Sequence, residues 1–360
     1  MITRRQLLQN TALFTGGLMM GCAVAGTTWR MPDEAMPHKR TWMAFGASER
    51  IWGKRLLPEV RRNLVTIAQT IARYEPVSMV VREQEYDLAR TMLGDAVELV
   101  VAPLDDLWIR DTGPVFVLSD QGEKAGIDFN FNGWGEKQIY RNDAAVARFV
   151  AQQAGVPIIN TELVLEGGCI EVDGRGTAII TESCVLNDNR NPGMSKAQFE
   201  ELLMPLLGLE KIIWLPGIRG KDITDGHTDF YARFIEPGVV VAGYEPDPAY
   251  VDHAVTKQHI DMLNAATDAR GQSLEVVVLE APSKIRDTYE TSDFAAGYVG
   301  FYVCNGAVIM QEFGDDVADQ AAQEALQQVF PDRDIVALNI DGIAAGGGSI
   351  HCATQQEPLL

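Results

Sequence analysis

A run of glycines near residue 350 leads directly into a cysteine. The stretch reads Gly346-Gly347-Gly348-Ser349-Ile350-His351-Cys352. Glycine has no Cβ, so its backbone can lie close to a ligand. A thiol beside such a backbone is well placed to attack a small, flat electrophile, and Cys352 is therefore our candidate nucleophile. The alternative at this point is a small cysteine buried in the core.

Three other polar clusters carry groups that could act with this thiol. They read Trp108-Ile109-Arg110-Asp111-Thr112-Gly113-Pro114, Glu166-Gly167-Gly168 and Gly226-His227-Thr228-Asp229. Taken alone, each could be structural: a local ion pair, a carboxylate at a tight turn, or half of a metal site. Together they supply one histidine, three carboxylates and a tryptophan.

Two histidines compete for the role of proton carrier. His227 and Asp229 are two positions apart, so in an extended segment their side chains would point to the same side. His351 is adjacent to Cys352, and neighbours in an extended segment point to opposite sides. Because histidine titrates near neutral pH, either could move a proton, and we favour His227 on direction.

The carboxylates indicate the kind of ligand. A guanidinium group is a flat cation with five N–H donors, which carboxylates accept in pairs. The sequence thus predicts a pocket for a planar cation beside a nucleophilic thiol.

Short strands alternate with amphipathic helices through the rest of the chain. Apolar β-rich runs predict strands at 41–45, 77–81, 97–102, 115–118, 127–131, 169–172, 177–181, 212–215, 230–235, 239–242, 274–279, 300–304, 307–311 and 335–339. A helical period predicts helices at 56–74, 142–154, 195–207, 247–267 and 317–330. The order is strand, strand, helix, strand, in roughly five units, which suits either an open α/β sheet or a ring of repeated units.

The ordered set of motifs resembles the agmatine deiminases and the bacterial, Porphyromonas-type peptidylarginine deiminases grouped with them. It includes Trp108-x-Arg110-Asp111-x-Gly113-Pro114, Glu166-Gly167-Gly168, Gly226-His227-x-Asp229, the run from Gly346 to Gln356, and the opening Met36-Pro37-His38-x-Arg40-Thr41-Trp42. The resemblance runs from about residue 32 to residue 357. It implies the pentein fold, a five-bladed α/β propeller of ββαβ repeats with pseudo-fivefold symmetry around a central site.

The resemblance also implies roles for these residues. Cys352 would attack the guanidinium carbon and form a covalent thiouronium, while His227 moves protons. Asp111 and Asp229 would hold the guanidinium, and Glu166 would orient His227 or share the cation. Further substrate contacts would come from Trp108, Gly347 and Gly348. Neither a metal nor an organic cofactor is implied.

The far end of the substrate is less specified. Agmatine carries a second cation, for which Asp222 and Asp225 are candidate partners, although Lys221 and Ile223 interrupt the usual acidic stretch. A peptide ending in arginine would need a cationic anchor, for which Arg141, Arg190 and Lys221 are candidates. We favour agmatine. An amidinotransferase and a non-catalytic guanidine-binding envelope protein remain alternatives.

The first 25 residues read as an export signal. Arg4 and Arg5 precede an uncharged apolar run that ends in Ala23-Val24-Ala25, the layout of a twin-arginine leader. We expect a single domain over 26–360, exported to the periplasm or beyond. The alternative is a lipid anchor on Cys22.

Composition limits the partners. The formal net charge of −20 argues against nucleic acid and anionic lipid and is compatible with a small cationic substrate. No segment after the leader is apolar enough to span a membrane. With Cys352 free, at most one pair among Cys169, Cys184 and Cys304 could form a disulfide. A homo-oligomer stays open.

Overall fold

The computed structural model describes residues 27–360. The expected export signal at 1–25 and the expected lipid site at Cys22 lie outside these residues, so both stay predictions. No helix in the described part of the chain is long and apolar enough to cross a membrane.

Three sheets are built from the same unit, two antiparallel strands, a helix and a third strand parallel to the second. Their elements are β8 (Ile170–Val172), β9 (Thr177–Thr181), α7 (Lys196–Leu207) and β10 (Lys211–Leu215); β11 (Ala232–Glu236), β12 (Val239–Tyr244), α8 (Asp252–Ala265) and β13 (Glu275–Glu280); and β14 (Tyr302–Cys304), β15 (Ala307–Gln311), α9 (Asp316–Val329) and β16 (Asp334–Leu338).

Two further sheets have four strands. One contains β5 (Val115–Ser119), β6 (Lys124–Asp128), α5 (Val146–Ala154) and β7 (Ile158–Asn160), with β1 (Trp29–Arg30) on its edge. The other contains β2 (His38–Phe45), α1 (Glu49–Ile71), β3 (Val77–Val81), α2 (Tyr86–Leu93), β4 (Val97–Val101) and, antiparallel to β2, β17 (Gln355–Pro358). A strand from beyond Cys352 therefore completes the sheet formed by residues 38–101.

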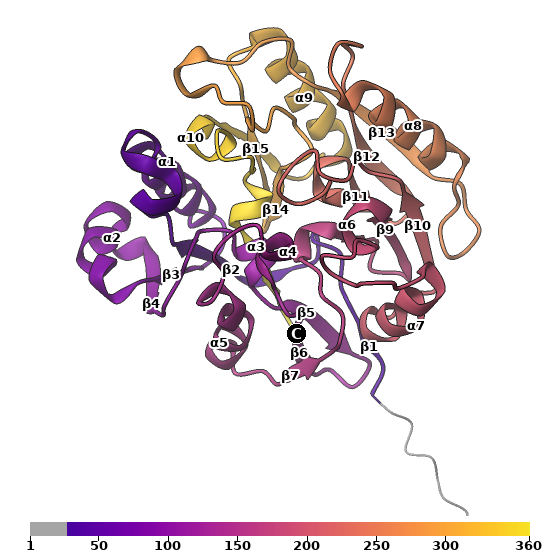
Figure 1. Ribbon diagram of the computed structural model, residues 1–360, viewed down its shortest axis with the longest axis horizontal. Helices are drawn as coiled ribbons and strands as arrows, with labels where there is room; N and C mark the ends of the chain where they lie inside the picture. The colour runs from indigo at the N-terminus through magenta and orange to yellow at the C-terminus, as the bar shows by residue number, and fades with distance from the viewer. Residues whose placement is uncertain (1–26) are drawn as a thin grey trace, which may run out of the picture.

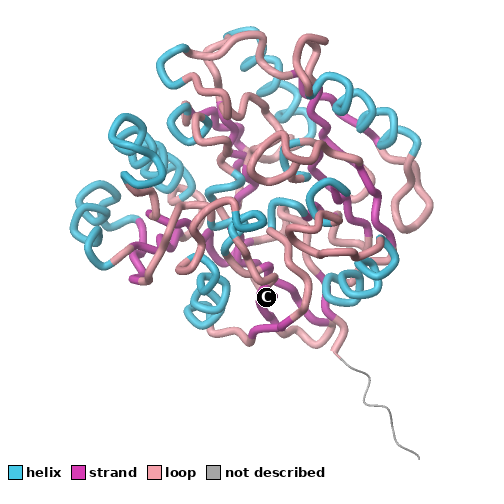
Figure 2. The backbone as a smooth tube through the Cα atoms, viewed as in Figure 1, coloured by secondary structure: helices cyan, strands magenta, loops and turns pink. Residues whose placement is uncertain are grey.

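The long helices lie around the periphery, while short helices and loops occupy the middle. Figure 1 shows α1, α2, α5, α7, α8 and α9 on the outside, and Figure 2 shows loops filling the centre. The short central helices are α3 (Ile109–Thr112), α4 (Gly133–Glu136) and α6 (Glu182–Val185). The polar clusters found in the sequence lie in or beside such short elements, between the ends of the strands.

The expected mixed α/β fold is confirmed, and the element boundaries differ in informative places. Strands β3, β9 and β15 match the expected ranges, and every residue in them is buried. Strand β6 begins earlier than expected, because Lys124 is buried against Glu357 instead of facing solvent. The strand ends at Asp128. Helix α7 begins after Ser195, which forms a capping box with Gln198.

Candidate active site

Three predicted site residues converge on one point above Gly168. A methyl group built on this glycine would lie 2.6 Å from Nδ1 of His227, 3.0 Å from Oδ1 of Asp111 and 3.0 Å from Oδ2 of Asp229. The side chains come from α3 and from the turn that precedes β11. Gly168 thus forms the floor of a small polar cup.

Two polar atoms of the cup residues have no hydrogen-bond partner within the described residues. They are Nδ1 of His227 and Oδ1 of Asp229, both buried. Buried polar atoms almost always have a partner in a folded protein, so this donor–acceptor pair indicates a place for a ligand. The third cup residue, Asp111, accepts hydrogen bonds from the Gly168 backbone at 3.2 Å and from Nε1 of Trp134 at 2.9 Å.

Cys352 lies beside the cup and is 6% exposed. Its Sγ is 3.3 Å from Oγ of Ser349 and 4.0 Å from Oδ2 of Asp229. Burial, followed by the charges of Asp229 and Asp111, raises the pKa of this thiol well above its usual value. The free site therefore favours the neutral thiol, and a cation entering the cup would favour the thiolate.

Glu166 holds the opposite edge of the His227 ring. Its Oε2 lies 3.2 Å from Nε2 of His227, and Nε of Arg190 donates to its Oε1 at 2.9 Å. Burial alone would lower the pKa of His227, but Asp111 and the bond to Glu166 raise it well above its usual value. An imidazolium held in this way can donate a proton from Nδ1 into the cup.

The pKa values of Asp111 and Asp229 are shifted in opposite directions. Burial is the main cause that raises the pKa of Asp111 to about 6, with His227 opposing the shift. Burial would also raise the pKa of Asp229, but the hydrogen bond from His351 and its charge bring it below the usual value. Asp229 therefore keeps its negative charge to lower pH than Asp111 does.

Both histidine segments differ from the extended conformation assumed from the sequence. His227 precedes the 3₁₀ turn Thr228–Phe230, and His351 begins the 3₁₀ turn His351–Ala353. The cup nevertheless brings His227 and Asp229 together, as expected. The ring of His351 points to Asp229 and Glu34, with Nδ1 2.7 Å from Asp229 and Nε2 2.9 Å from Glu34.

The glycine run packs against two indoles. A methyl group on Gly348 would lie 2.0 Å from the ring of Trp108, and one on Gly346 would lie 2.3 Å from the ring of Trp52. Gly347 has a φ of +86°, a conformation that other residues rarely adopt. In this run, Gly346 and Gly348 make room for the indoles, and Gly347 allows the turn that delivers Cys352.

Three residues support the site in roles that the sequence analysis did not assign to them. Trp134 holds Asp111, Arg190 holds Glu166, and Glu34 holds His351. Arg190 and Glu34 reach the site across long sequence separations, so no local pattern marks them. Trp134 carried a signal, because a tryptophan between two glycines suggests a turn that presents a ring.

The candidates for the far end of the substrate are largely engaged elsewhere. Asp225 accepts from Arg190 at 2.7 Å and from Lys137 at 2.6 Å, and Asp222 accepts from the Thr224 backbone and hydroxyl. Arg190 is buried between Glu166 and Asp225, so the expectation that it could anchor a peptide carboxylate is wrong. The other two candidate anchors, Arg141 and Lys221, are exposed.

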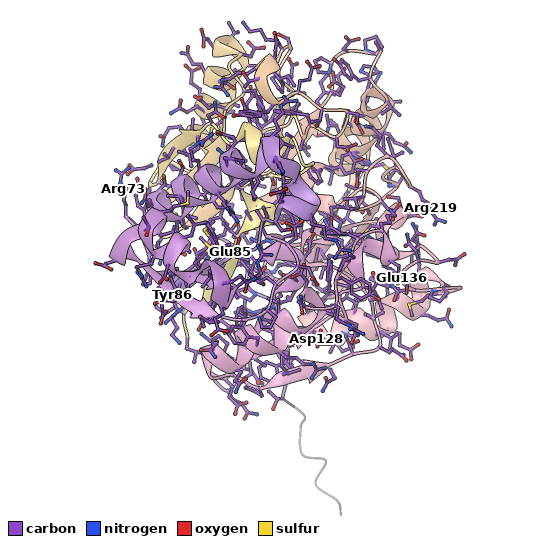
Figure 3. The ribbon with its side chains drawn as sticks, turned by 60° about the vertical axis from the view of Figure 1, so that its left-hand side comes forward. Arg73, Glu85, Tyr86, Asp128, Glu136 and Arg219 are labelled. Atoms are coloured by element: carbon purple, nitrogen blue, oxygen red, sulfur yellow. The ribbon has the colours of Figure 1, made fainter. Side chains whose placement is uncertain are left out.

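Lys137 links the loop after α4 to the loop before His227. Its Nζ donates to the Ile223 carbonyl at 3.0 Å as well as to Asp225. Figure 3 shows Glu136, the last residue of α4, and Arg219, from the loop before His227, on the same side of the molecule. Lys137 therefore ties the end of α4 to this loop.

One group of side chains has the composition of a metal site. Potential ligand atoms of Glu166, Cys169 and Cys184 lie within 4.8 Å of one another, and all three residues are buried. Glu166 is already paired with Arg190 and His227, and burial raises the pKa of the Cys184 thiol well above its usual value. We assign no metal to this group. The two cysteines are not joined by a disulfide.

Known proteins share this sequence and fold over nearly their whole length. A Streptomyces coelicolor protein is 41% identical over 339 residues, covering 92% of this chain and 99% of its own. The agmatine deiminase of Pseudomonas aeruginosa is 36% identical over 353 residues, covering 92% and 95%. The solved structure of Enterococcus faecalis agmatine deiminase superposes with a TM-score of 0.86 at 34% identity, covering 93% and 98%.

The family model for Porphyromonas-type peptidyl-arginine deiminases matches residues 30–358. This range holds all four polar clusters and nearly all the described residues. The resemblance drawn from the motifs is thereby confirmed, and the chain belongs to the Porphyromonas-type peptidyl-arginine deiminase family.

Proposed function

We propose that this protein is an agmatine deiminase, which hydrolyses the guanidinium group of agmatine to the ureido group of N-carbamoylputrescine and releases ammonia. The observation that carries the proposal is the cup above Gly168. It places two carboxylates and a histidine around one point beside a buried thiol. Relatives named agmatine deiminase cover most of both chains, which supports the same substrate.

In this proposal Asp111 and Asp229 bind the guanidinium. The carboxylate of Asp229, whose Oδ1 has no hydrogen-bond partner among the described residues, accepts one N–H group, and Asp111 accepts another. The cation offsets the negative charge beside Cys352, so the cost of ionising the thiol falls when substrate binds. Holding the guanidinium carbon next to sulfur replaces an encounter in solution with a fixed geometry.

When the cation binds, the thiol of Cys352 loses its proton to solvent, and in the first chemical step the thiolate Sγ forms a bond to the guanidinium carbon. His227 donates the proton on Nδ1 to the departing nitrogen, the C–N bond breaks, and ammonia leaves. A thiouronium remains on Cys352. The raised pKa of His227 keeps it protonated for this step.

The second step removes the adduct. Neutral His227 takes a proton from water at Nδ1, and the oxygen attacks the thiouronium carbon. The C–S bond then breaks, the hydroxyl proton of the adduct passes to the departing sulfur, and Cys352 is again a thiol beside a neutral ureido product. Glu166 keeps Nε2 of His227 engaged in both steps, so that Nδ1 always faces the cup.

The decisive assay incubates the protein with agmatine, free arginine and a peptide ending in arginine, and measures ammonia and ureido product. We expect product from agmatine. If only the peptide gave product, the substrate would be a C-terminal arginine and not agmatine. Binding without product would indicate a guanidine-binding protein, and transfer to an added amine without ammonia release would indicate an amidinotransferase.

The matched variant is Cys352→Ala. It should abolish product while the unfolding temperature stays near that of the wild type, because the side chain loses only one sulfur atom. Ureido product from this variant would show that the nucleophile lies elsewhere. Asp111→Asn and Asp229→Asn should lose activity far beyond any change in stability.

We further propose that the five sheets close into a five-bladed propeller with pseudo-fivefold symmetry, forming one domain over 26–360. The repeated unit of strand, strand, helix and strand supports this, as does the pairing of β17 with β2. A crystal structure would test the closure. Limited proteolysis should leave one resistant core, and two separately stable fragments would contradict a single domain.

We also propose that residues 1–25 direct export through the twin-arginine pathway, on the basis of the Arg4-Arg5 pair and the apolar run after it. Fractionation of cells expressing the full chain should place the protein outside the cytoplasm. Replacing both arginines with lysine should retain it inside. Equal distribution of both proteins would refute the signal, and a membrane-bound form lost on Cys22→Ser would favour the lipid anchor.

A further inference from the structure

His351, next to the nucleophile, belongs to a row of hydrogen-bonded charged side chains that has no part in the mechanism above. Its ring is 2% exposed. Nδ1 lies 2.7 Å from Oδ2 of Asp229, and Nε2 lies 2.9 Å from Oε2 of Glu34. Ionised carboxylates only accept hydrogen bonds, so both ring nitrogens must donate. The ring between two such groups is an imidazolium.

Glu34 is fixed in place from the other side. Its Oε2 accepts from Arg110 at 2.9 Å, while Oε1 accepts from Arg233 at 2.8 Å and from the Val303 backbone at 2.8 Å. Burial opposes its ionisation, but Arg233, His351 and Arg110 hold its pKa well below the usual value. The donors come from separate parts of the chain, so Glu34 can shift only if several elements shift with it.

The other contact of His351 fixes the orientation of the Asp229 carboxylate. His351 occupies Oδ2, and Oδ1 is the buried oxygen that has no partner among the described residues. Oδ2 is also the oxygen 4.0 Å from Sγ of Cys352. It is the oxygen that borders the cup as well, since a methyl group on Gly168 would lie 3.0 Å from it. The hydrogen bond from His351 therefore fixes the carboxylate at the cup and weakens the repulsion between Asp229 and a thiolate.

We infer that His351 is a positioning residue, which fixes the carboxylate of Asp229 at the cup in the orientation that binds the guanidinium, and that Glu34 holds His351 in turn. This inference rests on the proposed guanidine chemistry of the cup. It assigns no proton transfer to His351. The ring acts through a fixed direction and a fixed charge, and Asp229 remains the residue that touches substrate.

Two substitutions of His351 separate its contact with Asp229 from its contact with Glu34. In His351→Asn the amide nitrogen lies near the position of Nδ1 and can still donate to Asp229. In His351→Gln it lies near the position of Nε2, so the contact with Glu34 is kept and the one with Asp229 is lost. Both variants remove the same charge and similar volume, and each therefore controls for the other.

We expect His351→Gln to lower kcat/KM for agmatine about 100-fold, the size expected for a carboxylate misdirected by about an ångström. His351→Asn should stay within about tenfold of the wild type, at a similar unfolding temperature. Equal losses in the two variants, or full activity of His351→Gln, would overturn the inference. An inactive wild type would instead contradict the proposed function.

Two further measurements do not depend on turnover. Calorimetry on a Cys352→Ala background should show that His351→Gln weakens agmatine binding far more than His351→Asn. In wild-type protein labelled with ¹⁵N-histidine, the His351 ring should show two N–H signals at pH 8. A ring with only one protonated nitrogen would refute the inference even if neither variant folds.

Discussion

Gly168→Ala tests directly whether the cup is the place where the reaction occurs. The added methyl group would lie 2.6 Å from Nδ1 of His227, which is 0.8 Å short of the 3.4 Å where ordinary contact begins. His227 is fully buried and cannot swing into solvent. The φ angle of Gly168 is one that alanine accepts, so the substitution adds volume without straining the backbone.

A displacement of about 0.8 Å among reacting groups should lower kcat/KM about 100-fold, since an error near 1 Å costs that much. That loss corresponds to about 2.7 kcal/mol of transition-state stabilisation. Ammonia release from agmatine measures it, and thermal unfolding checks the fold. Gly297→Ala is the control, because its methyl group would meet nothing within 4 Å. A folded Gly168→Ala enzyme within threefold of wild type would refute the placement of the reaction in the cup.

Two further predictions concern charge. Asp111 has a pKa of about 6 and must be ionised to bind a cation, so kcat/KM should fall as the pH drops through that value. Trp134→Phe removes a hydrogen-bond donor to Asp111, and in this variant the acid limb of the pH profile should move up by about one pH unit. An unmoved limb would show that another group sets it. Lys124→Ala should lower the free energy of unfolding by about 3 kcal/mol in urea titrations, because the buried carboxylate of Glu357 in β17 loses its nearest cation and keeps only Lys39, Arg40 and the indole N–H of Trp42. Lys196→Ala, which removes the exposed ion pair between Lys196 and Glu182, is the control and should lower the free energy of unfolding by less than about 1 kcal/mol. Equal losses of stability in the two variants would contradict the argument.

The sequence predicted the centre of the fold better than its edges. Strands β3, β9 and β15 are short apolar runs whose residues are all buried, so composition alone marks them. Strand β17 reads Gln-Gln-Glu-Pro and has no apolar residue to mark it as a strand. Its burial depends on partners in β2 and on Lys124, which no local pattern shows.

The candidate site follows the same division. Residues of reactive type in glycine-containing motifs could be identified, and the structure brings Asp111, His227 and Asp229 together above Gly168. The supporting residue Glu34 lies in a segment without any catalytic pattern. It becomes meaningful only through contacts with residues more than seventy positions away, such as Arg110. Sequence periodicity carries no information on such contacts.

The pairing of β17 with β2 also bears on how the protein folds. Nε1 of Trp42 donates to Glu357, 315 positions later in the chain. Closing a loop of that length carries an entropic cost of about 5 kcal/mol, which earlier contacts must reduce before the two strands meet. Contacts between such distant segments are characteristic of slow folding. Cys352 lies just before β17, so a refolding chain should form most of its helices and strands while this thiol is still away from the active site. Enzyme activity should therefore return only in the slowest phase of refolding.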